Sequence, residues 1–247
     1  MNYFYEHFFK PQQVIPQNRV FSPEHIIITS ILVCLIIGSM MIQKQKRSKK
    51  FSQQVMMILG LIMLFLEIFR IAWKAYYYGF SIRTFRFDWC NQVCMVLPFV
   101  AIFKIEKIYP YIDTLAFMGG VGVLAYPMWV FYDYAGIHIM AVQSMISHGL
   151  MILIALMMPL ASKEYRRKSK RITKPLIGLG ILLVVAYVAS NRLGVSYLLM
   201  KDAGDLPIIS LIPYPYYWIL LLPLMVLGIY IARKLLVLID KWSMQTE

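Results

Sequence analysis

The stretch MAVQSMISHGLMILIALMMPL, residues 140–160, decides the fold of this chain. It has no charged side chain, and as a helix rising about 1.5 Å per residue it is long enough to cross the roughly 30 Å hydrocarbon core of a bilayer. Its polar side chains gather in the first half, at Gln143, Ser144, Ser147 and His148. The stretch therefore predicts a membrane span that carries polar groups near one surface.

The composition extends this prediction to the whole chain. The 247 residues are 60% hydrophobic and only 15% charged, with a mean hydropathy of +0.64. A soluble domain of this size needs more charge to cover its surface. The net charge of +13 lies mainly in short loops between apolar segments, where it orients helices against lipid. We therefore expect an integral membrane protein without a nucleic-acid partner.

Seven segments are long and apolar enough to be read as spans, which predicts an all-α, seven-helix transmembrane bundle. Ser22, Pro23 and Glu24 form a helix start signal for the first span. The chain reads as one domain, with an N-terminal segment at 1–21, the bundle at 22–236 and a tail at 237–247. The predicted spans are about 22–43, 52–73, 86–103, 112–130, 141–161, 175–191 and 214–236.

The distribution of Lys and Arg predicts the orientation. Alternating spans place 17 of these residues on one side and seven on the other, and only Arg70 lies within a span. The richer side faces the cytoplasm under the positive-inside rule. We therefore expect an outside N-terminus and a cytoplasmic C-terminus.

With the directions fixed, polar residues from five segments fall at one depth, just below the outer surface. Span two contributes Glu67 and Arg70, and the other segments contribute Cys90, Asn91, Gln92, Cys94, Gln143, Ser147, His148, Asn191, Arg192 and Tyr216. The inner halves of the spans read as nearly all apolar. Charged groups within a span usually face the bundle interior. We therefore expect an outward-facing polar cavity.

The cysteines and the histidine are candidate catalytic groups, each with a plainer explanation. Free cysteine often behaves as a small hydrophobe, and a histidine in an apolar helix is often only packed. Cys90 and Cys94, however, lie at a helix N-terminus, which favours the thiolate. Their parallel Cβ directions suit a disulfide badly. Cys34, in the middle of the first span, is expected to serve packing.

The charged and interfacial residues also allow two interpretations. Glu67 and Arg70 lie three apart on one helix face, so they either form an internal ion pair or serve a site. In the second case Glu67 orients a histidine and Arg70 meets a phosphate. Asn191, Arg192 and Tyr216 suit either a membrane interface or a lipid headgroup.

We expect no metal and no cofactor. His25 and His138 are weaker site candidates, because the spacings typical of zinc ligands are missing from the sequence. The last span has no lysine before Lys234 at its inner end, which argues against a retinal Schiff base there.

A resemblance adds to this reading. The ordered segments LEIFRIAWK (66–74), FDWCNQVCMVLPF (87–99), QSMISHGLMIL (143–153), NRLGVSYLLM (191–200) and PYPYYWIL (213–220) resemble the YwaF family of bacterial multi-pass membrane proteins. That family is similar to the eukaryotic transmembrane protein 164 family of lipid acyltransferases, which use a cysteine and a histidine. Carried over by position, these residues are Cys90 and His148, with Cys94 as the reserve nucleophile. The run before the cysteine departs from the usual Leu-Pro-Leu-His-Leu-Cys, reading Phe-Arg-Phe-Asp-Trp-Cys at 85–90.

Three functions remain open at this point. The first is a lipid acyltransferase or acyl-ester hydrolase in a bacterial cytoplasmic membrane, acting on phospholipid, with Cys90 as nucleophile and His148 as base. Asn91, Gln92 or Ser147 would donate hydrogen bonds to the oxyanion. The second is a transporter or lipid-binding accessory protein that uses the same cavity without catalysis. The third is a scaffold for a partner protein.

Overall fold

The computed structural model describes residues 2–11, 21–46, 48–127, 130–131, 134, 137–162, 165, 171–201 and 209–244. All regular structure in these residues is helical, which confirms the predicted all-α class. The helices are α1 (Asn2–Phe8), α2 (Pro23–Lys46), α3 (Lys49–Tyr78), α4 (Trp89–Ile102), α5 (Tyr109–Ala125), α7 (Ile139–Ala161), α8 (Thr173–Leu193) and α9 (Trp218–Met244). Two short 3-10 turns are η1 (Ile82–Thr84) and η2 (Ile209–Leu211).

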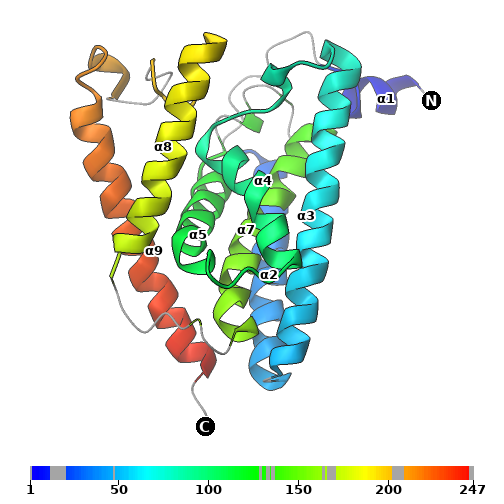
Figure 1. Ribbon diagram of the computed structural model, residues 1–247. Coiled ribbons are helices and arrows are strands. Elements are labelled where there is room, and N and C mark those ends of the chain that lie inside the picture. The colour runs from blue at the N-terminus through cyan, green and yellow to red at the C-terminus, as the bar shows by residue number, and fades with distance from the viewer. Residues whose placement is uncertain are drawn as a thin grey trace.

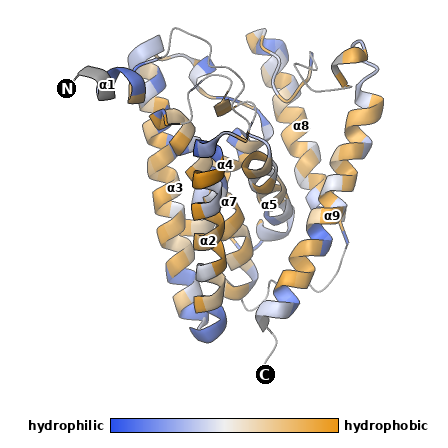
Figure 2. Cartoon of the chain, turned by 180° about the vertical axis from the view of Figure 1, so that it is seen from behind, coloured by the Kyte–Doolittle hydropathy of each residue, from blue (hydrophilic) through white to orange (hydrophobic). Residues whose placement is uncertain are grey.

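Successive long helices run in alternating directions, so the bundle has two ends (Figure 1). The α1 end holds α1, the starts of α2, α4, α7 and α9, and the last residues of α3, α5 and α8. The opposite end, where α9 finishes, is called the C-terminal end. Hydrophobic residues dominate the middle of the helices, and hydrophilic residues gather toward the two ends (Figure 2). This distribution is that of a multi-pass membrane protein.

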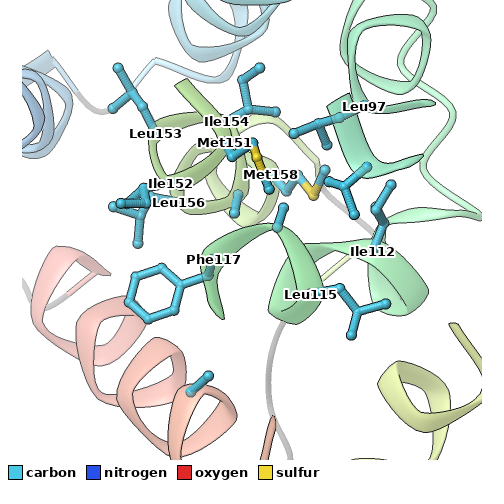
Figure 3. Packing of buried hydrophobic residues seen from close by; sticks show 14 of the residues in the cluster. Leu97, Ile112, Leu115, Phe117, Met151, Ile152, Leu153, Ile154, Leu156 and Met158 are labelled. Carbon is cyan, nitrogen blue, oxygen red and sulfur yellow. The ribbon is translucent and has the colours of Figure 1, made fainter. Parts of the chain in front are cut away.

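Helix α7 forms the centre of the bundle. It packs against α2, α3, α4, α5 and α9, and 72% of its most apolar 18 residues are buried, against 11% for α2. Its Met151, Ile154 and Met158 are completely buried and pack close to Leu97 and Leu115 of the neighbouring helices (Figure 3). The stretch that indicated the fold is therefore the core itself. An apolar helix that is buried all round needs other helices to cover it.

Each predicted span coincides with a helix, but the helices differ in length. Five of them, α2, α3, α7, α8 and α9, are long and apolar enough to cross a membrane. Helices α4 and α5 have 14 and 17 residues, which corresponds to about 21 and 26 Å. Both are shorter than the roughly 30 Å hydrocarbon core. They pack among the longer helices α3, α7, α8 and α9.

Several local expectations can be checked. The hydroxyl of Ser22 accepts the backbone N–H of His25 at 3.3 Å, which confirms the predicted cap of the first span. Cys34 is exposed on α2, so its expected role in packing is wrong. Helix α2 touches the bundle through a narrow strip, and Cys34 lies outside that strip, on the surface that faces lipid.

Glycines set the closest helix contacts. A Cβ on Gly60 of α3 would lie 3.1 Å from the carbonyl oxygen of Pro98 on α4. A Cβ on Gly178 of α8 would overlap the carbonyl oxygen of Tyr111 on α5. Small residues allow such backbone approach between membrane helices, where dispersion contacts and helix spacing determine association.

The C-terminal end contains a buried polar cluster that the sequence reading missed. Asp113 of α5 is completely buried; its Oδ2 accepts hydrogen bonds from Arg233 Nη1 of α9 at 2.9 Å and from the hydroxyl of Tyr165. Its Oδ1 accepts from the backbone N–H and the hydroxyl of Thr114. The expectation that the inner halves are nearly all apolar is therefore wrong, and Arg233, counted with the basic tail, lies inside the bundle.

At the α1 end the N-terminal segment lies on α3 and α7. The indole of Trp73 donates to the carbonyl of Phe9 at 2.9 Å, and His138 Nε2 pairs with the carbonyl of Lys10 at 3.0 Å. Burial lowers the pKa of His138 from its ordinary value, so the ring is neutral. Its Nδ1 accepts the N–H of Met140 and caps α7.

The contact at Gly178 yields a first prediction. Gly178→Ala should lower the stability of the purified protein by about 1–3 kcal/mol, because the added methyl forces α5 and α8 apart. Gly180→Ala is the matched control on the same helix, since nothing lies within 4 Å of its Cβ position. Thermal unfolding in detergent measures both. Equal stability of the two variants would show that the α5–α8 contact does not limit packing.

The Asp113 cluster yields a second prediction. Asp113→Ala leaves Arg233 buried without its carboxylate and should cost about 3–5 kcal/mol. The double variant Asp113→Ala/Arg233→Leu should recover part of this loss, because no uncompensated charge then remains buried. A double-mutant cycle of unfolding free energies measures the coupling. Strictly additive costs would contradict a direct pair.

Candidate functional site

The first part of the candidate site is an ion pair on α3. Arg70 donates from Nε to Glu67 Oε2 at 3.0 Å and from Nη2 to Glu67 Oε1 at 2.5 Å. Both residues are only 6% exposed, so the internal ion pair expected as one alternative is confirmed. Arg70 Nη1 is buried and has no hydrogen-bond partner among the described residues. The pair therefore neutralises its charge but keeps one unused donor.

Helix α7 brings its polar face against this part of α3. The side-chain amide of Gln143 donates to the backbone carbonyl of Leu66 at 3.2 Å and to the hydroxyl of Ser147 at 3.1 Å. Gln143 and Ser147 are four apart, so they share one helix face. This bridge fixes the level of α7 beside Glu67. The Ser147 hydroxyl accepts this bond and keeps its own hydrogen to donate.

His148 follows directly on α7. Its Nδ1 lies 2.7 Å from the carbonyl oxygen of Ser144, which can only accept, so Nδ1 carries the hydrogen. Its Nε2 is then the unprotonated nitrogen, and it is buried with no partner in the described part of the chain. The Ser144 carbonyl thus holds the ring where Glu67 was expected to do so. The ring is fixed with a free lone pair.

Cys90 lies in the first turn of α4 and faces α5. A Cβ on Gly119 would lie 3.2 Å from Cys90 Sγ and 3.2 Å from Met151 Cε, so the sulfur and that methyl are no more than twice this distance apart. The thiol is 3.9 Å from the Gly119 carbonyl, a weak contact that leaves the half-buried sulfur adjustable. The neighbouring Gly120 lies against the carbonyl of His148, where a Cβ would be 2.6 Å away. Two adjacent glycines of α5 therefore contact both predicted catalytic residues.

Cys94 lies one turn further along α4 and is buried. Its sulfur is 3.5 Å from the sulfur of Met151 on α7. Helices α4 and α7 run in the same direction, so Cys90 and His148 lie about 6 and 4.5 Å from this contact, both toward the α1 end. The helix register thus puts Cys90 and His148 in one layer and Cys94 below it.

Helix α3 adds the ion pair to the same layer. Gly60 packs against Pro98 and Ala101 of α4, and the two helices are antiparallel. Arg70 lies ten residues after Gly60 on α3, and Cys90 lies 8–11 residues before Pro98 and Ala101 on α4. Both are therefore about 15 Å from that contact toward the α1 end, at a similar level. The charges of Glu67 and Arg70 act on Cys94, whereas the charge that acts on Cys90 is that of Asp88, so the charged groups of the ion pair lie between the levels of the two cysteines and nearer to Cys94. The name "polar layer" is used below for the side chains at this level, Glu67, Arg70, Cys90, Gln143, Ser147 and His148.

Other predicted residues of α4 are occupied elsewhere. Gln92 uses its amide group to donate to the carbonyls of Phe87 at 2.7 Å and Leu182 at 3.0 Å, which ties α4 to α8. Asn91 is half-buried beside it. Asp88, the residue before α4, accepts the backbone N–H of Leu198 at 2.9 Å. Gln92 therefore has a structural role and no free hydrogen for an oxyanion.

The predicted residues at the ends of α8 and α9 are not part of the polar layer. Asn191 and Arg192 are exposed in the last turn of α8, and Tyr216 is 62% exposed before α9. The buried tyrosine is Tyr217, whose hydroxyl donates to the carbonyl of Leu199. These exposed residues suit a membrane interface or a headgroup, as the sequence suggested.

The sequence reading missed several contributors to the site. Ser144 holds His148 through its backbone carbonyl, Gly119 makes room for the thiol, and Met151 contacts Cys94. Gly119 and Gly120 of the small-residue run GGVG, residues 119–122, allow close helix approach, and Gly119 lies beside Cys90. A carbonyl contact leaves no side-chain signal from which it could be predicted.

The polar layer has the parts of a thiol–imidazole system without a metal. The described residues contain no group of three or more His, Cys, Asp or Glu that could hold a metal ion. The charged and amide side chains of the layer are each less than a tenth exposed, so they are packed closely. Cys90 and His148 Nε2 are not hydrogen-bonded to each other, a looseness that is common before a substrate binds.

The comparisons with known proteins place the chain. No curated protein and no solved structure matches it. The model of the TMEM164 family matches residues 20–232, which includes α2 to α8, most of α9 and the whole polar layer. The chain is therefore a multi-pass membrane protein that belongs to the TMEM164 family.

Proposed function

We propose that this protein is a thiol-dependent lipid acyltransferase or acyl-ester hydrolase. The observation that supports it best is the ring of His148 on α7, whose buried Nε2 has no partner among the described residues and which lies at about the level of Cys90 on α4. Leaving a polar atom buried without a partner costs about 1–3 kcal/mol, so such an atom in a native structure asks for an explanation. A base that awaits a proton is that explanation.

The reaction starts with a rotation of the Cys90 side chain, which brings its thiol to His148. Nε2 takes the thiol proton, and the thiolate attacks the carbonyl carbon of a lipid ester. The ester C–O bond breaks, and the leaving alkoxide takes the proton back from Nε2. A hydroxyl or water then attacks the acyl-cysteine, gives its proton to Nε2, and releases the sulfur. In this proposal the Ser147 hydroxyl donates a hydrogen bond to the oxyanion.

The Glu67–Arg70 pair provides the anion site of this proposal. Glu67 fixes the guanidinium by two hydrogen bonds, and the unused Nη1 remains for a lipid phosphate. A buried Arg with one free donor binds an anion more strongly than an exposed one, because water does not screen it.

The membrane arrangement is also proposed. All seven long helices, α2, α3, α4, α5, α7, α8 and α9, cross a bacterial cytoplasmic membrane as one domain, with the α1 end outside. The excess of Lys and Arg at the C-terminal end supports this orientation. The shorter α4 and α5 cross because their neighbours cover them. The polar layer then opens outward when a lipid enters.

A second function, phospholipid binding without catalysis, has one observation in its favour. The unused Nη1 of Arg70 is a ligand for an anion whether or not chemistry follows. Lipid binding that persists in Cys90→Ala, Cys94→Ala and His148→Gln variants, without any acyl-cysteine in the native protein, would support it over the enzyme.

The cysteines test the mechanism. Purified protein in nanodiscs with labelled phospholipid should form an acyl-cysteine at Cys90, and Cys90→Ala should abolish both the adduct and lipid turnover. His148→Gln should slow turnover about 10²–10⁴-fold. Mass spectrometry of the trapped adduct and lipid chromatography measure these effects.

Cys94→Ala is the matched control for that experiment. It lies one turn away and contacts Met151, so its removal should leave turnover within about twofold. Loss of the acyl-cysteine in Cys94→Ala but not in Cys90→Ala would show that Cys94 is the nucleophile. Normal turnover in both cysteine variants would refute a thiol mechanism.

Arg70 gives a separate prediction. Arg70→Lys keeps the charge beside Glu67 but loses the planar fork, so KM for a phospholipid should rise about tenfold with kcat nearly unchanged. A neutral diacylglycerol ester serves as the control substrate, because it lacks the phosphate. Equal losses on both substrates would show that Arg70 has only a structural role.

A further inference from the structure

A second feature lies on the surface, between α8 and α9 near the α1 end. It is a shallow, open groove of about 290 Å³. Its walls come from two helices and from the segment that connects them. The lining residues are Leu183, Val184, Tyr187, Met200, Trp218 and Leu222.

The lining is suited to a hydrocarbon chain. It exposes no polar surface, and it opens to the outside along two helices of which only 22% and 33% of the most apolar residues are buried. The same two helices are hydrophobic along this part of their length (Figure 2). In a bilayer, such a groove faces acyl chains rather than water. Tyr187 and Trp218 are the aromatic types that gather at the headgroup level.

Polar residues follow the lining residues along the chain toward the α1 end. Asn191 lies four residues after Tyr187 and seven after Val184, so it continues the groove face of α8. Lys201 follows Met200 of the lining, and Arg192 follows Asn191. These three side chains are exposed. An apolar slot with cations at one end matches one molecule in a membrane, a phospholipid with its chain in the slot and its phosphate at the end.

The groove is joined to the start of α4. The carbonyl of Leu182, next to Leu183 of the lining, accepts the amide of Gln92. Asp88 accepts the N–H of Leu198, two residues before Met200. These bonds connect the wall of the groove to the helix turn that carries Cys90.

We propose that the α8–α9 groove binds one acyl chain of a membrane phospholipid, with the phosphate at Asn191, Arg192 and Lys201. This inference deepens the proposed function and rests on it only for the fate of the lipid. The binding itself does not require Cys90. In this proposal Asn191 and Arg192 of α8 bind the headgroup of the lipid in the groove, and Arg70 remains the anion site of the buried polar layer.

Photo-crosslinking tests the proposal. The probe is a phosphatidylcholine with a diazirine in one acyl chain, added in trace amount to the full-length protein in detergent. Crosslinks should map to the peptides that contain 183–187 and 218–222, and excess unlabelled phosphatidylcholine should lower them at least about fivefold. Val184→Trp fills the groove and should reduce the specific crosslinks by a similar factor.

Val185→Trp is the matched control, because Val185 is exposed on the same helix, does not line the groove and is not three, four or seven residues from any lining residue of α8. It should leave the specific crosslinks unchanged. The double variant Arg192→Gln/Lys201→Gln should weaken competition by phosphatidylcholine but not by a neutral diacylglycerol. Labelling that excess lipid does not lower, or that both Trp variants change equally, would show an unspecific lipid surface and overturn the proposal.

The same crosslinks in Cys90→Ala separate the two proposals. Specific labelling without any acyl transfer would preserve the groove and remove the thiol chemistry. Acyl transfer by the native protein without specific labelling would support the thiol chemistry and refute lipid binding in the groove.

Discussion

Every polar group that this bundle carries into the bilayer must find its partner inside the protein, because lipid offers none. The Asp113 cluster meets this requirement in full. Both carboxylate oxygens accept two hydrogen bonds, and Arg233 reaches across from α9, a helix that otherwise touches the bundle sparsely. A buried charge that is completely satisfied fixes one arrangement of helices, because every other arrangement leaves it unpaired.

The polar layer at the opposite end is not fully hydrogen-bonded. It is just as buried, yet Arg70 Nη1 and His148 Nε2 have no partners in the described residues. The bundle thus contains two buried polar clusters. In the Asp113 cluster the carboxylate is fully hydrogen-bonded, as expected for a structural role. The polar layer keeps an unused donor and an unused acceptor, as expected for a binding or catalytic role. The unpaired polar atoms of the polar layer cost stability, and they occur at the level where the thiol of Cys90 also lies. That coincidence favours a site over a packing defect.

The sequence predicts the bundle and the depth of its groups better than their directions. Apolar run length predicts seven helices, and the helix rise predicts a common depth for the polar groups, with Cys94 nearer to His148 than Cys90; the choice of Cys90 comes from the family resemblance. The rotation of a helix about its axis cannot be predicted from the sequence where the helix has few polar residues to mark its faces. Asn191, Arg192 and Tyr216 therefore share the predicted depth but face outward. The pairing of Asp113 with Arg233 joins residues 120 positions apart, and no local spacing reveals such a contact.

The short length of α4 explains why the polar layer lies where it does. The 14 residues of α4 span about 21 Å, less than the hydrocarbon core, and its first turn lies below the ends of the longer α3 and α8 (Figure 1). Asp88 and Gln92 tie that recessed turn to the segment after α8 and to α8 itself. Cys90 thus stands in the first turn of a helix whose start is recessed from the α1 end of the bundle. The proposed thiol chemistry requires a position of this kind, because its lipid substrate stays in the bilayer.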